Sequence, residues 1–228
     1  MKLSACFLFI LQLCLAACAA DRPIFPPELT PGENHAGSER CESIFPRGRW
    51  QFVHSISFSM NDGSGATVVG VTSLDRNQIA CALMTIEGFT LFEAVYREDE
   101  GLEVKRAVPP FDRPAFAEGL LRDVKAIFQP PADGQPQSGR KADQTPVCRY
   151  TGDDGRVTDI LPAMDGCWQI NTFTAGRIMD RAIVGRSCRE MEGCRIPEYL
   201  ELTGYGQAGY TLKMFLLKAE NLNRETLP

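Results

Sequence analysis

The sequence has little that could support metal binding or histidine-dependent catalysis. Its two histidines, His35 and His54, have no neighbour at the spacing of metal ligands. It contains no Gly-x-Ser-x-Gly motif, no P-loop and no His-Glu-x-x-His motif. Because no nucleophile can be paired with a base, we expect a protein that is not an enzyme and that uses no metal and no cofactor.

Positive charge is also scarce relative to negative charge. The chain has 24 Lys and Arg residues against 29 Asp and Glu residues, which gives a formal net charge of −5. Nucleic-acid binding requires a basic surface, so we expect no nucleic-acid partner. No Cys-x-x-Cys motif occurs, which leaves a thioredoxin-type redox function without support.

An apolar run at residues 5–15 follows the basic residue Lys2 and ends in Leu-Ala-Ala-Cys at residues 15–18. The run is too short to cross a bilayer of ~30 Å as a helix, and it has the form of a secretory signal. Residues 15–18 resemble the bacterial lipobox, which implies that residues 1–17 are a signal peptide and that Cys18 is acylated. The alternative is an ordinary cleaved signal in which Cys18 has no role.

Ala19, the residue after Cys18, indicates which membrane holds the anchor. It is not the aspartate that tends to keep lipoproteins at the inner membrane of enteric bacteria. We therefore expect a lipid anchor in the outer membrane, with the protein facing the periplasm. Acyl chains contribute roughly 0.8 kcal/mol per buried methylene, so a multiply acylated cysteine needs no transmembrane helix.

Residues 18–47 contain five prolines and show little apolar periodicity. This composition predicts an extended tether between the membrane and a folded domain. Folded sequence is expected from near Trp50. The predicted domain therefore covers residues 48–222, and residues 223–228 form a C-terminal tail.

Six cysteines follow Cys18, and an even number in an exported chain favours disulfide bonds. Cys188 and Cys194 are close enough in sequence to close a local loop. Cys148 and Cys167 flank a predicted hairpin and form a second candidate pair. Cys81 lies within an apolar run, where we expect a buried free thiol. The other possible pairings stay open.

The chain between residues 50 and 108 has the pattern of five strands joined by short turns. Apolar positions and turn residues place these strands at 50–60, 66–74, 78–85, 89–96 and 102–108. The connections are too short for a crossover helix, so the strands are predicted to form an antiparallel meander.

Residues 114–128 have the apolar spacing of an amphipathic helix, with Phe116, Leu120, Val124 and Ile127 on one face. Residues 132–146 are predicted to form a mobile loop, and residues 175–195 are harder to assign. Further strands are expected at 147–150, 156–161, 167–173, 196–203 and 210–219. The predicted fold is mainly β, with the helix buried against the concave face of a curved sheet.

Three parts of the sequence together match one known family. They are residues 76–88, RNQIACALMTIEG, followed by Leu91, Phe92 and Ala94; residues 156–160 with Gly166-Cys167-Trp168; and residues 196–203 with 210–214. These segments resemble the bacterial lipoprotein carriers LolA and LolB, and especially LolB, with residues 76–94 similar to the third and fourth strands of that family. The resemblance covers roughly residues 49–222. It extends to a LolB-like group of uncharacterised outer-membrane lipoproteins, some of which resemble products of aryl-polyene lipid gene clusters.

The resemblance implies an unclosed antiparallel half-barrel with a helix across its concave face and a hydrophobic cavity that accepts acyl chains. It assigns to this cavity residues that would otherwise be read as core: Trp50, Phe52, Ile79, Leu83, Phe92, Tyr96, Phe116, Leu120, Val124 and Trp168. The implied function is binding or transfer of membrane lipid or acylated cargo, such as a lipoprotein or glycolipid, at the outer membrane. The alternative is an envelope scaffold that binds a protein partner and carries no lipid.

A loop tip separates this sequence from LolB. LolB carries an apolar residue there, which helps to hand cargo to the membrane. The matching position here is Glu87, with Ile86 beside it. This departure argues against a specific lipoprotein-insertion role, and it leaves the expected cavity fold unchanged.

Overall fold

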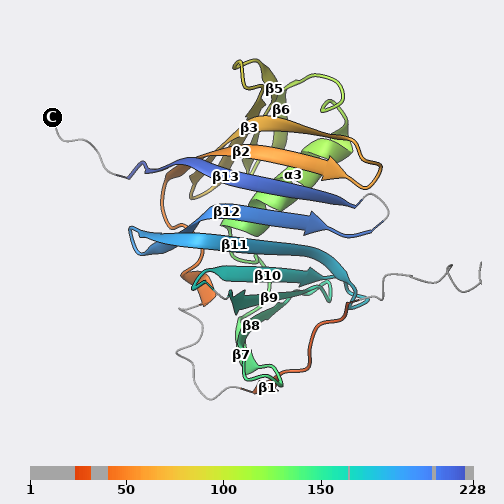
Figure 1. The fold of residues 1–228 in the computed structure, drawn as a ribbon, viewed down its shortest axis with the longest axis vertical. Coiled ribbons are helices and arrows are strands. Elements are labelled where there is room, and N and C mark those ends of the chain that lie inside the picture. The colour runs from red at the N-terminus through yellow and green to blue at the C-terminus, as the bar shows by residue number, and fades with distance from the viewer. Residues whose placement is uncertain (1–23, 32–40, 164, 207–208, 224–228) are drawn as a thin grey trace, which may run out of the picture.

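The computed structural model describes residues 24–31, 41–163, 165–206 and 209–223. Within these residues the chain forms one sheet of thirteen strands and a 15-residue helix, α3 (Pro114–Phe128), which lies against the sheet (Figure 1). The strands are β1 (Thr30–Pro31), β2 (Trp50–Met60), β3 (Gly65–Asp75), β4 (Gln78–Met84), β5 (Thr90–Arg97), β6 (Gly101–Ala107), β7 (Gln137–Arg140), β8 (Pro146–Thr151), β9 (Val157–Pro162), β10 (Trp168–Phe173), β11 (Met179–Met191), β12 (Cys194–Gly204) and β13 (Tyr210–Asn221). The predicted signal peptide and Cys18 lie outside the described residues.

The sheet is antiparallel throughout and does not close. Its order is β1-β7-β8-β9-β10-β11-β12-β13-β2-β3-β4-β5-β6. β13 pairs with β2 in a register that joins Tyr210 to Met60 and Asn221 to Trp50. Among the described strands, β1 and β6 stand at the two margins and do not pair with each other. The predicted unclosed half-barrel is confirmed.

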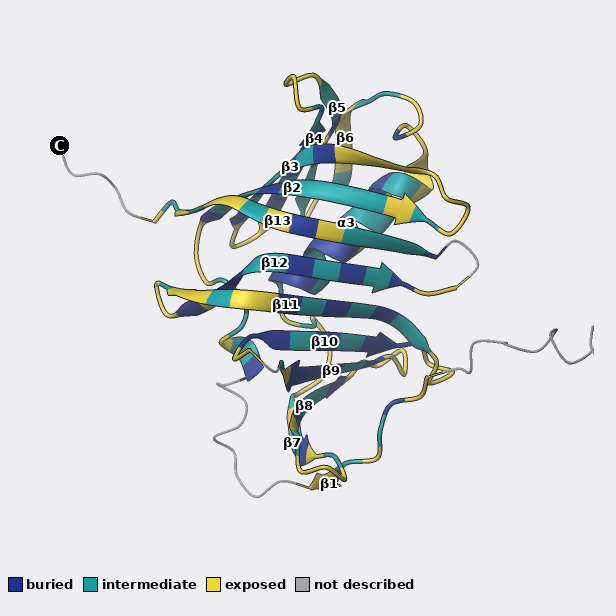
Figure 2. Ribbon diagram, viewed as in Figure 1, coloured by how far each residue is buried: buried dark blue, intermediate teal, exposed yellow. Residues whose placement is uncertain are grey.

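The five strands predicted between residues 50 and 108 are present as β2 to β6, within one residue of the predicted bounds. Their side chains alternate between the two faces of the sheet. On β4, Ile79, Cys81 and Leu83 are buried, and the residues between them are half-buried. Figure 2 shows the same alternation along the central strands. The sheet therefore presents one apolar face to the core.

α3 crosses the concave face of the sheet (Figure 1). Its apolar side faces the sheet. Pro114 stands in the first turn, where a residue without an N–H loses no intrahelical hydrogen bond. The helix ends before Gln129, which is extended ahead of Pro130. Val124, Ile127 and Phe128 are buried against the sheet. The predicted helix is confirmed at both ends.

Two strands lie where the sequence predicted a loop or no clear structure. β7 falls within the predicted mobile loop at 132–146 and pairs with β8, so the loop prediction is wrong there. β7 has no large apolar residue and is held by backbone pairing near the margin of the sheet, so the sequence shows no strand pattern there. β11 fills most of the 175–195 stretch. Exposed residues such as Arg186, Arg189 and Glu190 on its second half hide its alternation.

The segment before Trp50 is part of the folded domain. β1 pairs with β7, and Cys41 is bonded to Cys148 on β8. Phe45 is 3% exposed and lies in the same apolar cluster as Trp50. The predicted extended tether is therefore wrong for the described residues before Trp50. Backbone pairing, a disulfide and one aromatic side chain hold them, and none of these produces a periodic pattern in sequence.

A buried ion pair also holds this segment. Arg149 on β8 donates to both carboxylate oxygens of Asp159 on β9, with Nε–Oδ1 at 2.6 Å and Nη2–Oδ2 at 2.7 Å. The same Nη2 donates to the carbonyl oxygen of Pro27 at 2.9 Å. Asp159 is 1% exposed, so this contact links two strands and the N-terminal segment away from water.

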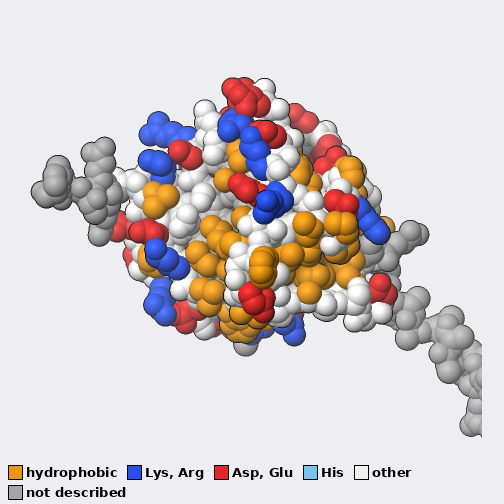
Figure 3. Space-filling view, turned by 90° about the horizontal axis from the view of Figure 1, so that it is seen from above, with side chains coloured by type: hydrophobic (Ala, Val, Ile, Leu, Met, Phe, Trp, Pro, Cys, Tyr) orange, Lys and Arg blue, Asp and Glu red, His pale blue; other side chains and the backbone are white. Residues whose placement is uncertain are grey.

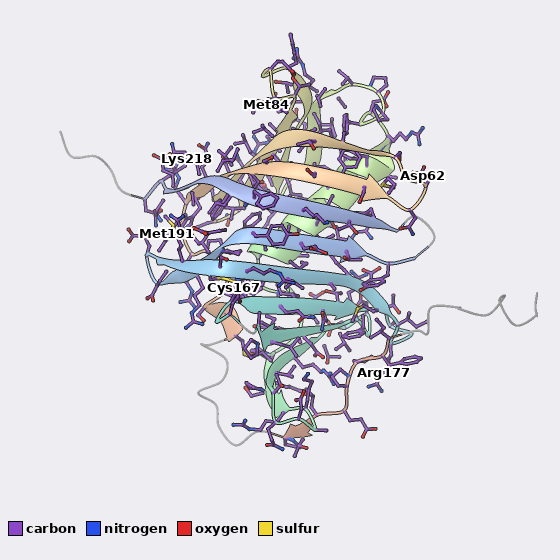
Figure 4. All side chains as sticks on the ribbon, viewed as in Figure 1. Asp62, Met84, Cys167, Arg177, Met191 and Lys218 are labelled. Atoms are coloured by element: carbon purple, nitrogen blue, oxygen red, sulfur yellow. A yellow bond between two sulfur atoms is a disulfide. The ribbon has the colours of Figure 1, made fainter. Side chains whose placement is uncertain are left out.

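The disulfide between Cys167 and Cys188 replaces the predicted pairing of Cys188 with Cys194. The β11–β12 hairpin pairs Met191 with Cys194 and therefore sets Cys188 opposite Pro197. Cys167 lies just before β10, which runs beside β11 (Figure 4). The predicted pairing is wrong because closeness in sequence takes no account of strand register.

The second predicted pairing, Cys148 with Cys167, is also wrong. β9 lies between β8, which carries Cys148, and β10, which Cys167 precedes. Cys148 bonds instead to Cys41. Cys81 and Cys194 are free and buried, which confirms the predicted free thiol at Cys81. Burial raises the pKa of the Cys81 thiol to about 11.

We expect the Cys41–Cys148 bond to contribute more to stability than the Cys167–Cys188 bond. The first spans 107 residues of chain and the second spans 21. In the loop-entropy model these spans correspond to about 5 and about 3 kcal/mol in the free energy of unfolding. Urea unfolding of Cys41→Ser/Cys148→Ser and of Cys167→Ser/Cys188→Ser should show the larger loss for the first variant. A larger loss for the second, or peptide mapping that links Cys188 to Cys194, would contradict this assignment.

Candidate functional site

The ten residues predicted to line an acyl cavity belong to, or pack against, two apolar clusters that also contain residues of α3. Seven are buried in two apolar clusters: Trp50, Phe52, Ile79, Val124 and Trp168 in one, and Leu83 and Phe92 in the other. Tyr96, Phe116 and Leu120 are half-buried and pack against these clusters, with Leu120 touching both. In this structure, side chains fill the space between helix and sheet.

Aromatic rings form the centre of this interface. The ring centroids of Trp50 and Phe52 lie 5.6 Å apart, and Phe52 stacks on Phe128 of α3 at 4.8 Å. His54 lies beside both phenylalanines and is 2% exposed. Burial lowers the pKa of His54 to about 4. A neutral His54 therefore belongs to the apolar surface under the helix.

One polar network crosses the same interface. Asp123 of α3 lies with its Oδ1 2.9 Å from Nε of Arg181 on β11. The hydroxyl of Tyr210 on β13 donates to both Asp123 oxygens, at 2.9 and 2.7 Å. Burial raises the pKa of Asp123, in spite of the opposing attraction of Arg181. Burial and the Asp123 charge raise the pKa of Tyr210 to about 12.

This network was not predicted from the sequence, although the sequence contains a signal for it. Asp123 stands within the apolar stripe of the helix, three residues after Leu120 and directly before Val124. A carboxylate at such a position needs a buried partner, because an unpaired buried charge is costly. The partners Arg181 and Tyr210 come from strands that only the folded sheet brings near the helix.

An open cavity of about 330 Å³ lies at the C-terminal end of α3. Its walls come from residues 76–79, from the end of β5, from the last turns of α3, and from residues 129–133 and 150–158. Of the ten predicted cavity residues, Ile79 and Tyr96 border it. Most of the lining comes from turns, which carry no apolar period and so gave no signal in the sequence.

The β4–β5 loop presents two apolar side chains to solvent. Ile86 is 74% exposed and Phe89 is 72% exposed, on either side of Glu87 and Gly88. The loop is closed by a hydrogen bond from Gly88 N–H to Thr85 O at 3.0 Å, and Gly88 has the positive φ of 92° that this turn requires. The sequence placed Ile86 and Glu87 at this tip but assigned Phe89 to a strand. Hydrogen bonds from its own backbone N–H and from Thr85 lower the pKa of Glu87, which stays ionised.

Figure 3 views the molecule from the end that carries β5 and β6 in Figure 1. A broad apolar area lies there beside groups of Lys, Arg, Asp and Glu side chains. In the part of the chain that the structure describes, no cluster of His, Cys, Asp and Glu could hold a metal ion. None of the described helices has the length and apolar character needed to cross a membrane.

No family model matches the chain, and no curated protein matches it by sequence. A crystal structure of a LolA superfamily protein from Nitrosomonas europaea is similar to it, with a TM-score of 0.55 and 10% identity. The match covers 81% of this chain and 91% of that chain. This likeness shows the fold, and the predicted LolA/LolB-like fold is confirmed.

Two other solved structures match over a similar length. One is described as an outer membrane lipoprotein-sorting protein domain from Vibrio parahaemolyticus, with a TM-score of 0.48, 5% identity, and coverage of 81% and 89%. The other is a DUF1329 family protein from Desulfovibrio piger, with a TM-score of 0.45, 8% identity, and coverage of 81% and 90%. Both TM-scores are below 0.5, so the fold assignment rests on the first structure.

Replacing Asp123 alone should lower the free energy of unfolding more than replacing Asp123 and Arg181 together. Asp123→Leu leaves Arg181, which is 5% exposed, with only the looser contact to Asp180, whose Oδ2 lies 3.6 Å from Nη1. We expect a loss of about 3–5 kcal/mol in the free energy of unfolding. Asp123→Leu/Arg181→Met replaces both charges by apolar groups and should cost less than Asp123→Leu alone. Urea unfolding of the two single variants and the double variant measures the difference.

The exposed pair Lys218–Glu220 provides the control, because its side chains are 59% and 46% exposed. Lys218→Met should change the free energy of unfolding by less than about 1 kcal/mol. Additive losses for Asp123→Leu and Arg181→Met would show that the two charges do not stabilise each other.

Proposed function

We propose that this LolA-like chain is a membrane-anchored periplasmic protein that binds and transfers lipid or acylated cargo at the outer membrane. The observation that carries the proposal is the interface under α3. One helix covers the concave face of an unclosed sheet, and both surfaces are apolar and aromatic. An acyl chain that replaces the helix on this surface gains about 0.8 kcal/mol per buried methylene.

The attachment of α3 suits movement as a unit. Proline pairs at 109–110 and 130–131 bracket the helix, so its ends are already separated from the flanking strands. Most of its packing on the sheet is apolar, and Asp123 supplies the buried polar link. When α3 moves away, the side chains that fill the interface become the walls of an acyl site. Leu120 lies at the junction of its two parts.

The β4–β5 loop supplies a membrane contact in this proposal. Ile86 and Phe89 extend into solvent on either side of Glu87. Two exposed apolar side chains on a short loop can enter the interfacial layer of a bilayer, while an ionised carboxylate stays among the headgroups. Cys18, if acylated as its sequence context predicts, keeps the domain at the inner leaflet of the outer membrane.

A non-enzymatic envelope scaffold is the second candidate function. Two observations favour it: side chains fill the interface under α3, and Glu87 places a charge at the loop tip. A scaffold forms a stoichiometric complex with an envelope protein and carries no lipid. Crosslinking in cells, followed by mass spectrometry of the captured protein and lipid, separates the two functions.

Leu120→Asp should abolish lipid binding and leave the sheet folded. The new carboxylate would lie in the acyl site when α3 is open, and it would reach water at the half-buried edge of the helix when α3 is closed. The assay uses the exported chain with Cys18→Ala, extraction of copurified lipid, and the uncharged fluorescent probe N-phenyl-1-naphthylamine. Far-UV circular dichroism monitors the sheet.

Ala115→Asp is the matched control, because it adds the same charge to an exposed position of the same helix. It should bind lipid and probe like the parent chain. Global unfolding of Leu120→Asp would mean that α3 is a fixed part of the core. A parent chain with no copurified lipid and no probe binding would favour the scaffold.

Replacing Cys18 with Ala should release the protein from the membrane fraction into the soluble periplasmic fraction. The acyl chains on Cys18 are the permanent anchor in the proposal. The two exposed apolar side chains of the β4–β5 loop supply only a transient contact, so loss of the acyl chains should remove stable membrane attachment. Cys14→Ala removes a cysteine near the same site and should leave fractionation unchanged. Membrane fractionation of the Cys18→Ala chain would refute the lipid anchor.

A further inference from the structure

The cavity at the C-terminal end of α3 carries a surplus of positive charge. Five cationic side chains border it: Arg76, Arg122, Lys125, Arg156 and Arg181. Three carboxylates border it: Glu98, Asp133 and Asp154. The chain as a whole has a formal net charge of −5, so the surplus is a local property of this cavity.

Three of these cations lack a carboxylate partner. Arg76, Arg122 and Lys125 form no ion pair with any residue that the structure describes. Lys125 Nζ lies 3.5 Å from the centroid of the Tyr96 ring, which also borders the cavity. The cavity therefore holds positive charge that neighbouring acidic residues do not neutralise.

The helix dipole does not account for this arrangement. A cation near the C-terminal end of a helix, such as Lys125, is stabilised by the carbonyl groups there. Arg76 lies in the β3–β4 turn and Arg156 in the β8–β9 turn, so neither gains from that dipole. Arg156 Nε is 3.6 Å from Asp154, a loose contact at a half-exposed site. The five cations thus come from four elements, and among them Arg181 is paired with Asp123 and Arg156 is close to Asp154.

Tyr150 adds a buried polar group without a partner. Its side chain borders the cavity and the residue is 3% exposed. Its hydroxyl makes no hydrogen bond with any residue that the structure describes. The hydroxyl oxygen is itself buried, so it lies behind the cavity wall, and the cationic side chains are the groups that can reach a ligand.

We propose that this cavity binds a phosphate group, presented as the phosphomonoester headgroup of an amphiphile. A phosphomonoester carries a charge of about −1.5 to −2 near pH 7 and accepts hydrogen bonds from several directions. A ligand with this charge and these acceptors can contact several cations at once, and the cavity is bordered by cations from different elements. A carboxylate carries one charge in one plane, which a single arginine matches in a two-pronged contact.

The walls and size of the cavity favour an amphiphile over free phosphate. Phe45, Pro130 and Pro131 form apolar parts of the wall. Ile79 and Tyr96 border the cavity and also pack in the cluster under α3, so the cavity adjoins the proposed acyl site. A volume of about 330 Å³ accommodates a headgroup but is at the lower end for a whole lipid. The lipid part of this assignment rests on the proposed carrier function, and phosphate binding itself does not.

The test uses calorimetric titration of the full chain carrying Cys18→Ala, at low ionic strength. The ligands are dihexanoyl phosphatidic acid, inorganic phosphate, dihexanoyl phosphatidylcholine and octanoate, each below its micelle concentration. We expect phosphatidic acid to bind and inorganic phosphate to compete with it. Arg122→Gln/Lys125→Gln should lower the affinity for phosphatidic acid and for inorganic phosphate at least tenfold. Each charge-assisted contact contributes on the order of a factor of ten to the affinity. Lys213→Gln, an exposed charge on β13 outside the cavity, should leave both unchanged.

The outcomes distinguish this assignment from the carrier function. If Arg122→Gln/Lys125→Gln and Lys213→Gln change the affinity for phosphatidic acid equally, the proposed site is wrong. Equal binding of octanoate, or of phosphatidylcholine, overturns the choice of a phosphomonoester. Binding of the uncharged probe without binding of either phosphate ligand refutes the headgroup site and leaves the carrier function standing. Another outcome is a chain that binds phosphate through Arg122 and Lys125 and yet binds no probe. That result supports the phosphate site and refutes the carrier function.

Discussion

The sheet of this protein does not close, so its concave apolar face needs a cover that the strands themselves do not supply. α3 is that cover. Large side chains such as Trp50 and Phe52 of the sheet and Phe128 of the helix pack in the contact between them. The same constraint connects stability with function. A surface that must be covered can be covered by a helix or by acyl chains, and the two compete for the same free energy of burial.

The buried carboxylate of Asp123 gives this apolar contact a defined geometry. Apolar packing is non-directional, and a helix held by it alone could slide or rotate by one turn at small cost. Asp123 reaches both Arg181 and the Tyr210 hydroxyl in one position of the helix only. Because burial works against the ionised form of Asp123, the network fixes the position of α3 without holding it as strongly as its contact distances suggest.

The sequence predicts the parts of this fold that have a period, and it misses the parts that depend on pairing. β2 to β6 and α3 were correctly placed because their apolar residues recur every second position or on one helix face. β7 and the second half of β11 were missed because backbone hydrogen bonds, rather than apolar residues, define them. Both predicted disulfide pairings were wrong, because the strand order and register of the folded sheet, and the placement of the segment that carries Cys41, decide which cysteines meet.

In the candidate site, too, some residues could be predicted from the sequence and others could not. All ten apolar residues that the LolB resemblance selected belong to, or pack against, the two apolar clusters that also contain residues of α3. The charged cavity beside it is assembled from turns and helix residues far apart in the chain, such as Arg76 and Arg156, which no local pattern connects. Asp123 could have been found from the sequence, as a charge on the wrong face of an amphipathic helix.

The pairing of β13 with β2 has a consequence for how the chain becomes a domain. These two central strands are the last and the first of the long strands to leave the site of synthesis. Until β13 arrives, β2 and β12 each present a bare edge, and two separate sheets share one helix. Such contacts across the length of the chain form slowly, and bare edges invite pairing with other molecules. An emerging chain of this topology is therefore exposed to pairing with other molecules until its final long strand joins the two halves.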